Sequence, residues 1–228
     1  MKIAKRVTAV PPYLFVQISR TIAEKKAQGI EVISFGIGDP DISTPQHILD
    51  GLTGASLDAP NHRYPESEGL PEFRESVAEW YLRRFGVSLD SEKEIISLIG
   101  AKEGIGHASL AFVESGDVAL IPDPGYPVYS VGTLFAGGKT HVVPLTEQND
   151  WLPDIDAIPE EVAYNATVLW LNYPNNPTAA IADRGFFDRI VAFAKRYDIA
   201  VMHDACYTDV AYDDYKPPSF LEVEGAKD

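Results

Sequence analysis

The sequence has little cysteine, little positive charge and no long hydrophobic run. Cys206 is the single cysteine of the 228 residues, which excludes an intrachain disulfide framework and the paired cysteines of a zinc ribbon. Lysine and arginine number 19 against 34 aspartate and glutamate residues, and this balance argues against a sequence-independent grip on nucleic acid or an anionic membrane. Apolar stretches fall far short of the roughly 20 residues of a membrane span, so we expect a cytoplasmic protein.

Hydrophobic residues make up 45% of the chain, enough to fill the core of a large domain. Helical and strand patterns alternate along it. We expect helices at 14–28, 71–85, 102–113, 127–136 and 184–197, and strands at 31–35, 94–99, 117–121, 141–143, 167–171 and 199–203. Strands separated by helices need crossover connections, so the pattern predicts a mostly parallel sheet in a three-layer α/β/α fold.

Ligands of such sheets bind at the carboxyl ends of the strands, and three polar groups follow expected strands. Residues 100–104 combine glycines with the start of a helix, where backbone N–H groups can hold a phosphate, although a plain turn has the same pattern. In the second group, Pro174 and Pro177 stiffen the backbone around Asn176. That loop is either a turn or a rigid support that aims an amide at a ligand.

The third group places Asp204 directly after an apolar run. A carboxylate there needs a cationic or N–H partner, because an unpaired buried charge is costly. A pyridinium nitrogen is one such partner, and Tyr207 could bond an oxygen of the same ring. The alternative is that Asp204 caps a helix. A metal site with His203 and Cys206 is disfavoured because no matching ligand cluster lies elsewhere in the sequence.

Six motifs in order resemble the fold-type I pyridoxal-phosphate aminotransferases of class I and II over essentially the whole chain. They are Gly-Ile-Gly-Asp-Pro-Asp at 36–41, Arg-Tyr-Pro at 63–65 with Gly-Leu at 69–70, Gly-Ala-Lys-Glu at 100–103, Asp-Pro-Gly-Tyr-Pro at 123–127, Asn-Tyr-Pro-Asn-Asn-Pro-Thr at 172–178, and Asp204 with Tyr207. Segments 11–15, 61–65 and 215–223 are most similar to the LL-diaminopimelate aminotransferase branch.

The resemblance implies pyridoxal 5′-phosphate as the cofactor. Backbone N–H groups around Ala101 and Lys102 would hold its phosphate, and Tyr126 would stack on its ring. Asn176 and Tyr207 would bond the 3′ oxygen of that ring.

The resemblance further implies that Asp204 pairs with the ring nitrogen and keeps it protonated, which makes the ring a better electron sink. Gly38 would contact the substrate carboxylate, and Tyr13 and Lys102 would line the substrate pocket. Tyr64 would reach the phosphate in the neighbouring subunit, so the resemblance implies a homodimer or pairing with a complete subunit.

The Schiff-base lysine of this family lies in a Ser-x-Ser-Lys segment, which we expect roughly ten residues beyond Asp228. Lys216 and Lys227 lack that context. We therefore expect residues 1–40 to form an N-terminal arm with a small-domain segment, and residues 41–228 to form an incomplete cofactor-binding large domain. Alone, the chain should hold the cofactor weakly and should not transaminate.

Two further residues near the expected site call for a separate interpretation. Ala179 stands where the family usually has glycine, and a positive φ there would strain the loop by about 1 kcal/mol. Cys206 is interpreted as a packing residue.

The function that the resemblance implies is amino transfer, from LL-diaminopimelate to a 2-oxo acid such as 2-oxoglutarate. Alternatives are another amino-acid aminotransferase or a carbon–sulfur lyase of the same fold, and a non-catalytic remnant or dimerising module. A dinucleotide-binding domain is disfavoured because the first strand-to-helix turn lacks the glycine fingerprint.

Overall fold

The computed structural model describes residues 2–36, 38 and 41–228, and it divides into two units, Met1–Pro65 and Glu66–Asp228. The first unit contains α1 (Lys5–Thr8), α2 (Leu14–Ala27), α3 (Gln46–Ser56) and a short 3₁₀ helix at Ala59–Asn61. None of its described side chains is buried. The boundary expected after residue 40 refers to the domains of the whole family fold, and it stays a prediction.

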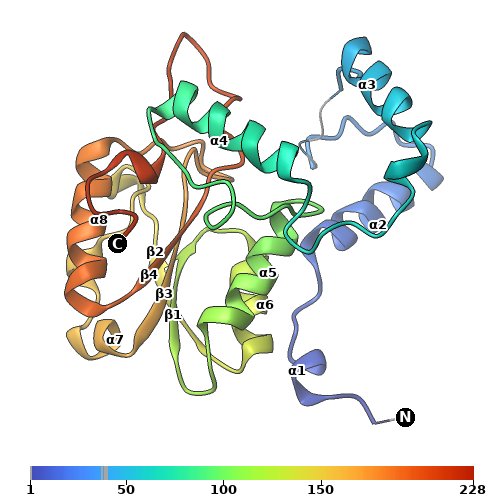
Figure 1. Ribbon diagram of the computed structural model, residues 1–228. Coiled ribbons are helices and arrows are strands. Elements are labelled where there is room, and N and C mark those ends of the chain that lie inside the picture. The colour runs from blue at the N-terminus through green and yellow to red at the C-terminus, as the bar shows by residue number, and fades with distance from the viewer. Residues whose placement is uncertain (1, 37, 39–40) are drawn as a thin grey trace. The chain divides into compact units, whose positions relative to one another are not determined.

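The second unit contains a parallel sheet of four strands, β1 (Val118–Asp123), β2 (Lys139–Pro144), β3 (Ala166–Asn172) and β4 (Ala200–Asp204), in the order β2-β1-β3-β4. Its helices are α4 (Pro71–Phe85), α5 (Ala101–Phe112), α6 (Pro127–Ala136), α7 (Glu160–Tyr164) and α8 (Arg184–Tyr197), with 3₁₀ helices at Glu147–Asn149, Ile155–Ala157 and Phe220–Glu222. Helices α7 and α8 cover one face of the sheet, and α5 and α6 cover the other (Figure 1). The three-layer α/β/α prediction is confirmed.

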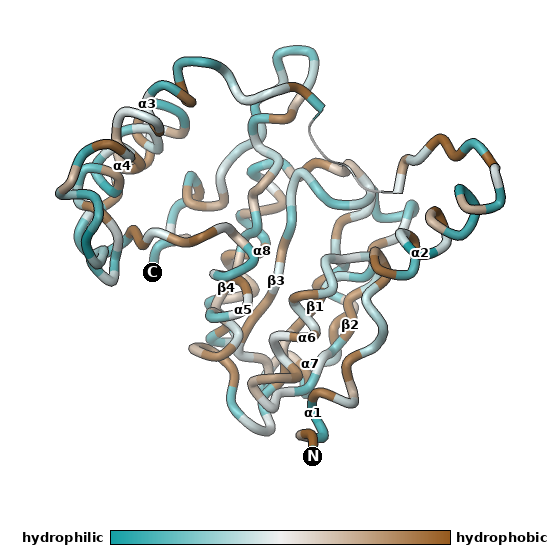
Figure 2. Tube along the Cα trace, turned by 90° about the vertical axis from the view of Figure 1, so that its right-hand side faces the viewer, coloured by the Kyte–Doolittle hydropathy of each residue, from teal (hydrophilic) through white to brown (hydrophobic). Residues whose placement is uncertain are grey.

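Successive strand residues supply two separate cores, because side chains alternate between the faces of a sheet. Leu169 and Leu171 of β3 pack in the cluster that includes the apolar side of α8. Val168 and Trp170 pack in the cluster that includes Ile105 of α5 and Tyr129 of α6. Brown, hydrophobic stretches of the sheet run between the flanking helices in Figure 2. The same alternation decides which way the residues at the strand ends project.

Local signals explain where the helices begin and end. Pro71 occupies the first turn of α4, and Gly86 ends that helix with a φ of 70°. The Asp183 side chain accepts a hydrogen bond from the Phe186 N–H at 2.7 Å and caps α8. These boundaries agree with the sequence prediction within one or two residues.

Two of the expected strands are wrong. Segments 31–35 and 94–99 are irregular, although both carry apolar residues at strand-like positions. In the second, the Ser97 N–H donates to the Glu68 carbonyl at 2.9 Å, an isolated bond outside any ladder. A strand exists only where a neighbour pairs with it, and no sheet of the described residues includes either segment.

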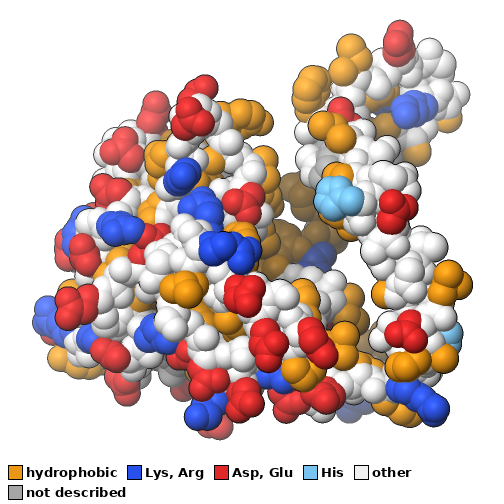
Figure 3. Space-filling view, turned by 45° about the horizontal axis from the view of Figure 1, so that its top comes forward, with side chains coloured by type: hydrophobic (Ala, Val, Ile, Leu, Met, Phe, Trp, Pro, Cys, Tyr) orange, Lys and Arg blue, Asp and Glu red, His pale blue; other side chains and the backbone are white. Residues whose placement is uncertain are grey.

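Acidic and basic side chains are interspersed on the face shown in Figure 3, in keeping with the formal net charge of −15. No helix in the described part of the chain has the length and hydrophobicity that crossing a membrane requires.

Candidate functional site

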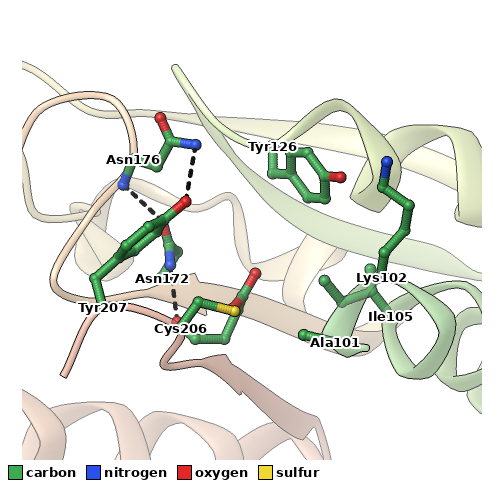
Figure 4. Close-up of a pocket in the computed structure, with 9 residues that line it drawn as sticks. Ala101, Lys102, Ile105, Tyr126, Asn172, Asn176, Cys206 and Tyr207 are labelled. Atoms are coloured by element: carbon green, nitrogen blue, oxygen red, sulfur yellow. Dashed lines mark hydrogen bonds between the residues drawn. The ribbon is translucent and has the colours of Figure 1, made fainter. Parts of the chain in front are cut away.

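A cavity of about 180 Å³ lies in the second unit, at the carboxyl ends of β3 and β4 and the beginnings of α5 and α6. Its lining brings together residues from four separate parts of the sequence (Figure 4): Ala101, Lys102, Ile105, Tyr126, Asn172, Asn176, Asp204, Cys206 and Tyr207. All six residues predicted to bind the cofactor within this unit are among them. They meet here because parallel strands end at one edge of the sheet.

Asp204 is the last residue of β4, and its carboxylate is held from the buried side. The Tyr129 hydroxyl donates to Oδ2 of Asp204 at 2.6 Å. The Tyr129 ring is fully buried and lies parallel to Trp170, with 4.8 Å between the ring centroids. Burial, together with the Asp204 charge, raises the pKa of the Tyr129 phenol, so Tyr129 remains a donor at neutral pH.

The helix-cap alternative for Asp204 does not hold, since residues 206–209 form a turn and no helix begins there. The described residues contain no group of three or more His, Cys, Asp or Glu side chains that could hold a metal ion. Asp204 therefore presents a carboxylate to the cavity with one oxygen already bonded by Tyr129.

An amide and a phenol lie together at another wall of the cavity. Nδ2 of Asn176 is 3.4 Å from the Tyr207 hydroxyl, the bond drawn between these two side chains in Figure 4. Burial raises the pKa of the Tyr207 phenol, with a smaller contribution from Cys206, so this hydroxyl also stays protonated near neutral pH. The pair offers donors to one ligand oxygen, the arrangement that the resemblance implies for Asn176 and Tyr207.

The beginning of α5 forms a third wall. Ala101 and Lys102 are its first two residues, and the first turn of an α-helix has backbone N–H groups without intrahelical partners. The Glu103 carboxylate accepts the Ile99 N–H at 2.6 Å and fixes the turn that precedes the helix. Such a helix start is suited to an anion.

An aromatic ring and an ammonium group complete this side of the cavity. Tyr126 precedes α6, and its ring meets Tyr129 edge-on at 5.9 Å. Nζ of Lys102 lies 5.7 Å from the centroid of the Tyr126 ring, within cation–π range. In Figure 4 the Tyr126 and Lys102 side chains lie on the side of the cavity opposite Tyr207.

Cys206 lines the cavity but is not set up as a nucleophile. Desolvation by its surroundings raises the pKa of the thiol to about 12, and a hydrogen bond to Asp204 and the charge of that carboxylate act in the same direction. A thiol this far from ionisation reacts slowly, because the thiolate is the nucleophilic form. The raised pKa argues against a redox role, but Cys206 is exposed, so the structure does not bear out the packing interpretation.

Sequence reasoning missed Tyr129 and assigned no role to Asn172. The sequence carried a signal for Tyr129 but not for Asn172. Tyr129 follows Tyr126 by three residues, the spacing that places two side chains on one face of a helix. Asn172 ends β3 in register with Asp204, which only the pairing of β3 with β4 reveals.

Tyr13, Gly38 and Tyr64 belong to the first unit. Tyr13 packs against Phe15, with 5.4 Å between the ring centroids, and Tyr64 is fully exposed in the described chain. Their substrate and cofactor roles stay predictions.

Known proteins are similar to this chain over nearly its whole length. The curated LL-diaminopimelate aminotransferase of Desulforudis audaxviator is 56% identical over 225 residues, which are 99% of this chain and 57% of that protein. The protein of the same name from Dehalococcoides mccartyi is 55% identical over 228 residues, or 100% of this chain and 59% of that protein. The chain thus spans less than two thirds of the length of these relatives.

Solved structures give the same result. Apo-BacF from Bacillus subtilis superimposes with a TM-score of 0.94 at 38% identity, covering 100% of this chain and 58% of that one. A probable N-succinyldiaminopimelate aminotransferase from Thermus thermophilus gives a TM-score of 0.88, also at 38% identity, covering 94% of this chain and 58% of that one. The family model of aminotransferase class I and II matches residues 30–227. The chain therefore belongs to the class I and II aminotransferase family.

Proposed function

We propose that this chain forms the pyridoxal 5′-phosphate site of an aminotransferase. The observation that carries the proposal is the meeting of four kinds of group around one cavity: the Asp204 carboxylate, the Asn176–Tyr207 pair, the Tyr126 ring and the start of α5. This donor set fits the cofactor group by group, since a pyridinium, a phenolic oxygen, a flat ring and a phosphate each find a complementary partner.

Each residue has a distinct task in the proposed site. Asp204 holds a proton on the ring nitrogen by its charge, and Tyr129 orients that carboxylate from behind. Asn176 and Tyr207 would hold the ring through its 3′ oxygen, while Tyr126 would limit the tilt of the ring and exclude water from one face. The N–H groups at Ala101 and Lys102 hold the phosphate. When bound, pyridoxal phosphate supplies the electron sink that makes removal of a substrate α-proton possible.

The proposed substrates are LL-diaminopimelate as amino donor and a 2-oxo acid such as 2-oxoglutarate as acceptor. Support comes from the curated relatives named LL-diaminopimelate aminotransferase, which are 55–56% identical to this chain. We further infer a dimeric enzyme in which Tyr64 of one copy reaches the phosphate of the other. The exposed position of Tyr64 in the chain is consistent with that role.

A binding experiment tests the site. The 228-residue chain titrated with pyridoxal phosphate should change the absorption of the ligand, and Asp204→Asn should weaken binding by roughly tenfold or more, the effect of losing a charged hydrogen bond. Asp209→Asn is the matched control, because that exposed carboxylate, 3.6 Å from Arg84, does not line the cavity. Equal affinity of the Asp204 variant and the wild type would exclude the proposed pairing.

Two further experiments test whether the cofactor is bound covalently and which amino donor is used. Borohydride treatment should leave no reduced adduct, since the chain is proposed to bind without a covalent bond; an adduct on Lys102, which lines the cavity, would contradict this. For substrate, the chain can be joined to the remaining residues of the Desulforudis relative. That chimera should form glutamate from LL-diaminopimelate and 2-oxoglutarate, and activity only with other amino donors would refute the proposed donor.

A further inference from the structure

The side chain of Asn172 lies between the two segments that carry the ring-binding groups. Asn172 is the last residue of β3, it is 3% exposed, and its register partner is Asp204. On β3 it shares a face with Val168 and Trp170, which is the face covered by α5 and α6. Its amide is therefore enclosed at the floor of the cavity, where each of its hydrogen bonds is shielded from water.

Both ends of this amide are bonded, and each end holds a different segment. Nδ2 donates to the backbone carbonyl of Asp204 at 2.8 Å. Oδ1 accepts the backbone N–H of Asn176 at 2.7 Å. Figure 4 shows both bonds leaving the Asn172 side chain. One planar group thus fixes the backbone of Asp204 relative to the backbone of Asn176.

The loop that carries Asn176 depends on this anchor and on its neighbour Asn175. Nδ2 of Asn175 donates to the Asn172 carbonyl at 3.1 Å, and its Oδ1 accepts the Thr178 hydroxyl at 2.8 Å. These bonds shape the loop internally. The Asn172 amide joins the loop to the end of β4 at the backbone level, whereas the Asn176–Tyr207 contact is a longer side-chain bond of 3.4 Å.

We propose that Asn172 is a positioning residue, whose amide sets the separation between Asp204 and Asn176 and thereby the affinity of the site for the pyridine ring. This inference rests on the proposed function. A donor and an acceptor in one rigid plane are both needed, so no other short side chain supplies the two bonds at once. Aspartate keeps the acceptor for Asn176 but loses the donor to Asp204, and leucine loses both.

Amide hydrogen exchange tests the bridge without any ligand. The Asn176 amide should be protected in the wild type, remain protected in Asn172→Asp, and exchange faster in Asn172→Leu. Protection of the Leu169 amide, in the middle of β3, shows whether each variant is folded. Asn165→Leu is the matched control at the opposite end of β3, where the side chain donates to the Glu161 carbonyl at 2.7 Å. Unchanged exchange of Asn176 in a folded Asn172→Leu would overturn the bridge.

Titration with pyridoxal phosphate then tests positioning. Asn172→Asp and Asn172→Leu should each bind the cofactor roughly tenfold more weakly, the scale of one lost buried hydrogen bond, while Asn165→Leu matches the wild type. Inorganic phosphate should bind all four proteins equally, because α5 does not depend on Asn172. Wild-type affinity in both Asn172 variants would overturn the positioning role. Failure of the wild type to bind pyridoxal phosphate would instead remove the proposed function and the ring-positioning role with it, leaving the exchange result to decide the bridge.

Discussion

Two polar side chains fix Asp204 in place, one bonded to its carboxylate and the other bonded to its backbone carbonyl. Tyr129 bonds the carboxylate at 2.6 Å, and Asn172 bonds the backbone carbonyl at 2.8 Å. Both partners are buried, and Tyr129 is held in addition by its stacking on Trp170. A carboxylate oriented in this way loses little freedom when a ligand binds, which favours tight binding.

Replacing Tyr129 with phenylalanine tests the strength of this support. We expect the free energy of unfolding to fall by about 1–2 kcal/mol, because a buried hydrogen bond to a charged group is lost while the aromatic stacking remains. Urea denaturation of Tyr129→Phe, Asp204→Asn and the double variant measures the coupling between the two side chains. Tyr164→Phe, at an exposed position, is the control. Additive effects of the two single substitutions would show that the charge of Asp204 does not strengthen the 2.6 Å contact, because the asparagine oxygen can still accept from Tyr129.

The sequence predicted most of the residues that line the cavity, but it did not predict the residues that hold them in place. Asp204, Asn176 and Tyr126 stand in recognisable motifs after strands, so sequence reasoning could find them. The role of Tyr129 depends on α6 packing over the end of β4, and that of Asn172 depends on the register of two strands that are separated in sequence by the whole of α8. Sequence spacing carries no information on such pairings until the sheet order is known.

Among the elements, helices were easier to predict than strands for a physical reason. The ends of α4 and α8 are set by Pro71, Gly86 and Asp183, which act within a single turn of chain. A strand depends on a partner that is distant in sequence. Segments 31–35 and 94–99 have strand-like composition but form no ladder, whereas the equally short β4 is a strand because β3 pairs with it. Local pattern therefore determines a helix more completely than it determines a strand.

The loop between β3 and α8 contains a strained residue. Ala179 has a φ of 59°, and its N–H donates to the Asn175 carbonyl at 2.8 Å. For an L-residue with a side chain this left-handed conformation costs roughly 1 kcal/mol, whereas glycine adopts it freely. Ala179 therefore has the positive φ under which the sequence analysis predicts strain in this loop.

Ala179→Gly should therefore stabilise the chain. We expect the free energy of unfolding to rise by about 1 kcal/mol, with the hydrogen bonds of the loop unchanged. Urea denaturation of the variant against the wild type measures this. Ala180→Gly is the neighbouring control; it should be neutral or destabilising, since Ala180 is not among the residues with positive φ. A decrease in stability of Ala179→Gly would mean that the added freedom of the unfolded chain outweighs the relief of strain.

On the scale of the whole molecule, the two faces of the sheet have different chemistry at their carboxyl ends. Asp204 shares the α5 and α6 face with Met202, and it belongs to the cavity. His203 projects to the α8 face, where its ring meets Phe187 edge-on at 5.1 Å and its Nε2–H donates to the Tyr173 carbonyl at 3.1 Å. Consecutive residues of one strand thus serve two purposes, the proposed cofactor binding on one face and stability on the other.

The burial of His203 makes stability depend on pH. Desolvation lowers the pKa of His203 from 6.5 to about 4, opposed by the bond to Tyr173 and by the charge of Asp204. The folded chain keeps this ring neutral, while the unfolded chain takes up a proton below a pH of about 6.5. Between about pH 4 and about pH 6.5 the unfolded chain therefore binds more protons than the folded chain. The stabilisation that the neutral ring provides is complete above about pH 6.5 and is lost as the pH falls toward about 4.

We expect the free energy of unfolding to fall by about 2 kcal/mol between about pH 7.5 and about pH 5 on account of this one group, before most carboxylates are protonated. Urea denaturation across this range measures the slope. His203→Gln should have a flatter profile, because glutamine retains an N–H donor for the Tyr173 carbonyl but does not titrate. His107→Gln, at an exposed position on α5, should keep the wild-type slope. Parallel profiles of the wild type and His203→Gln would show that the buried imidazole does not govern the acid stability of the chain.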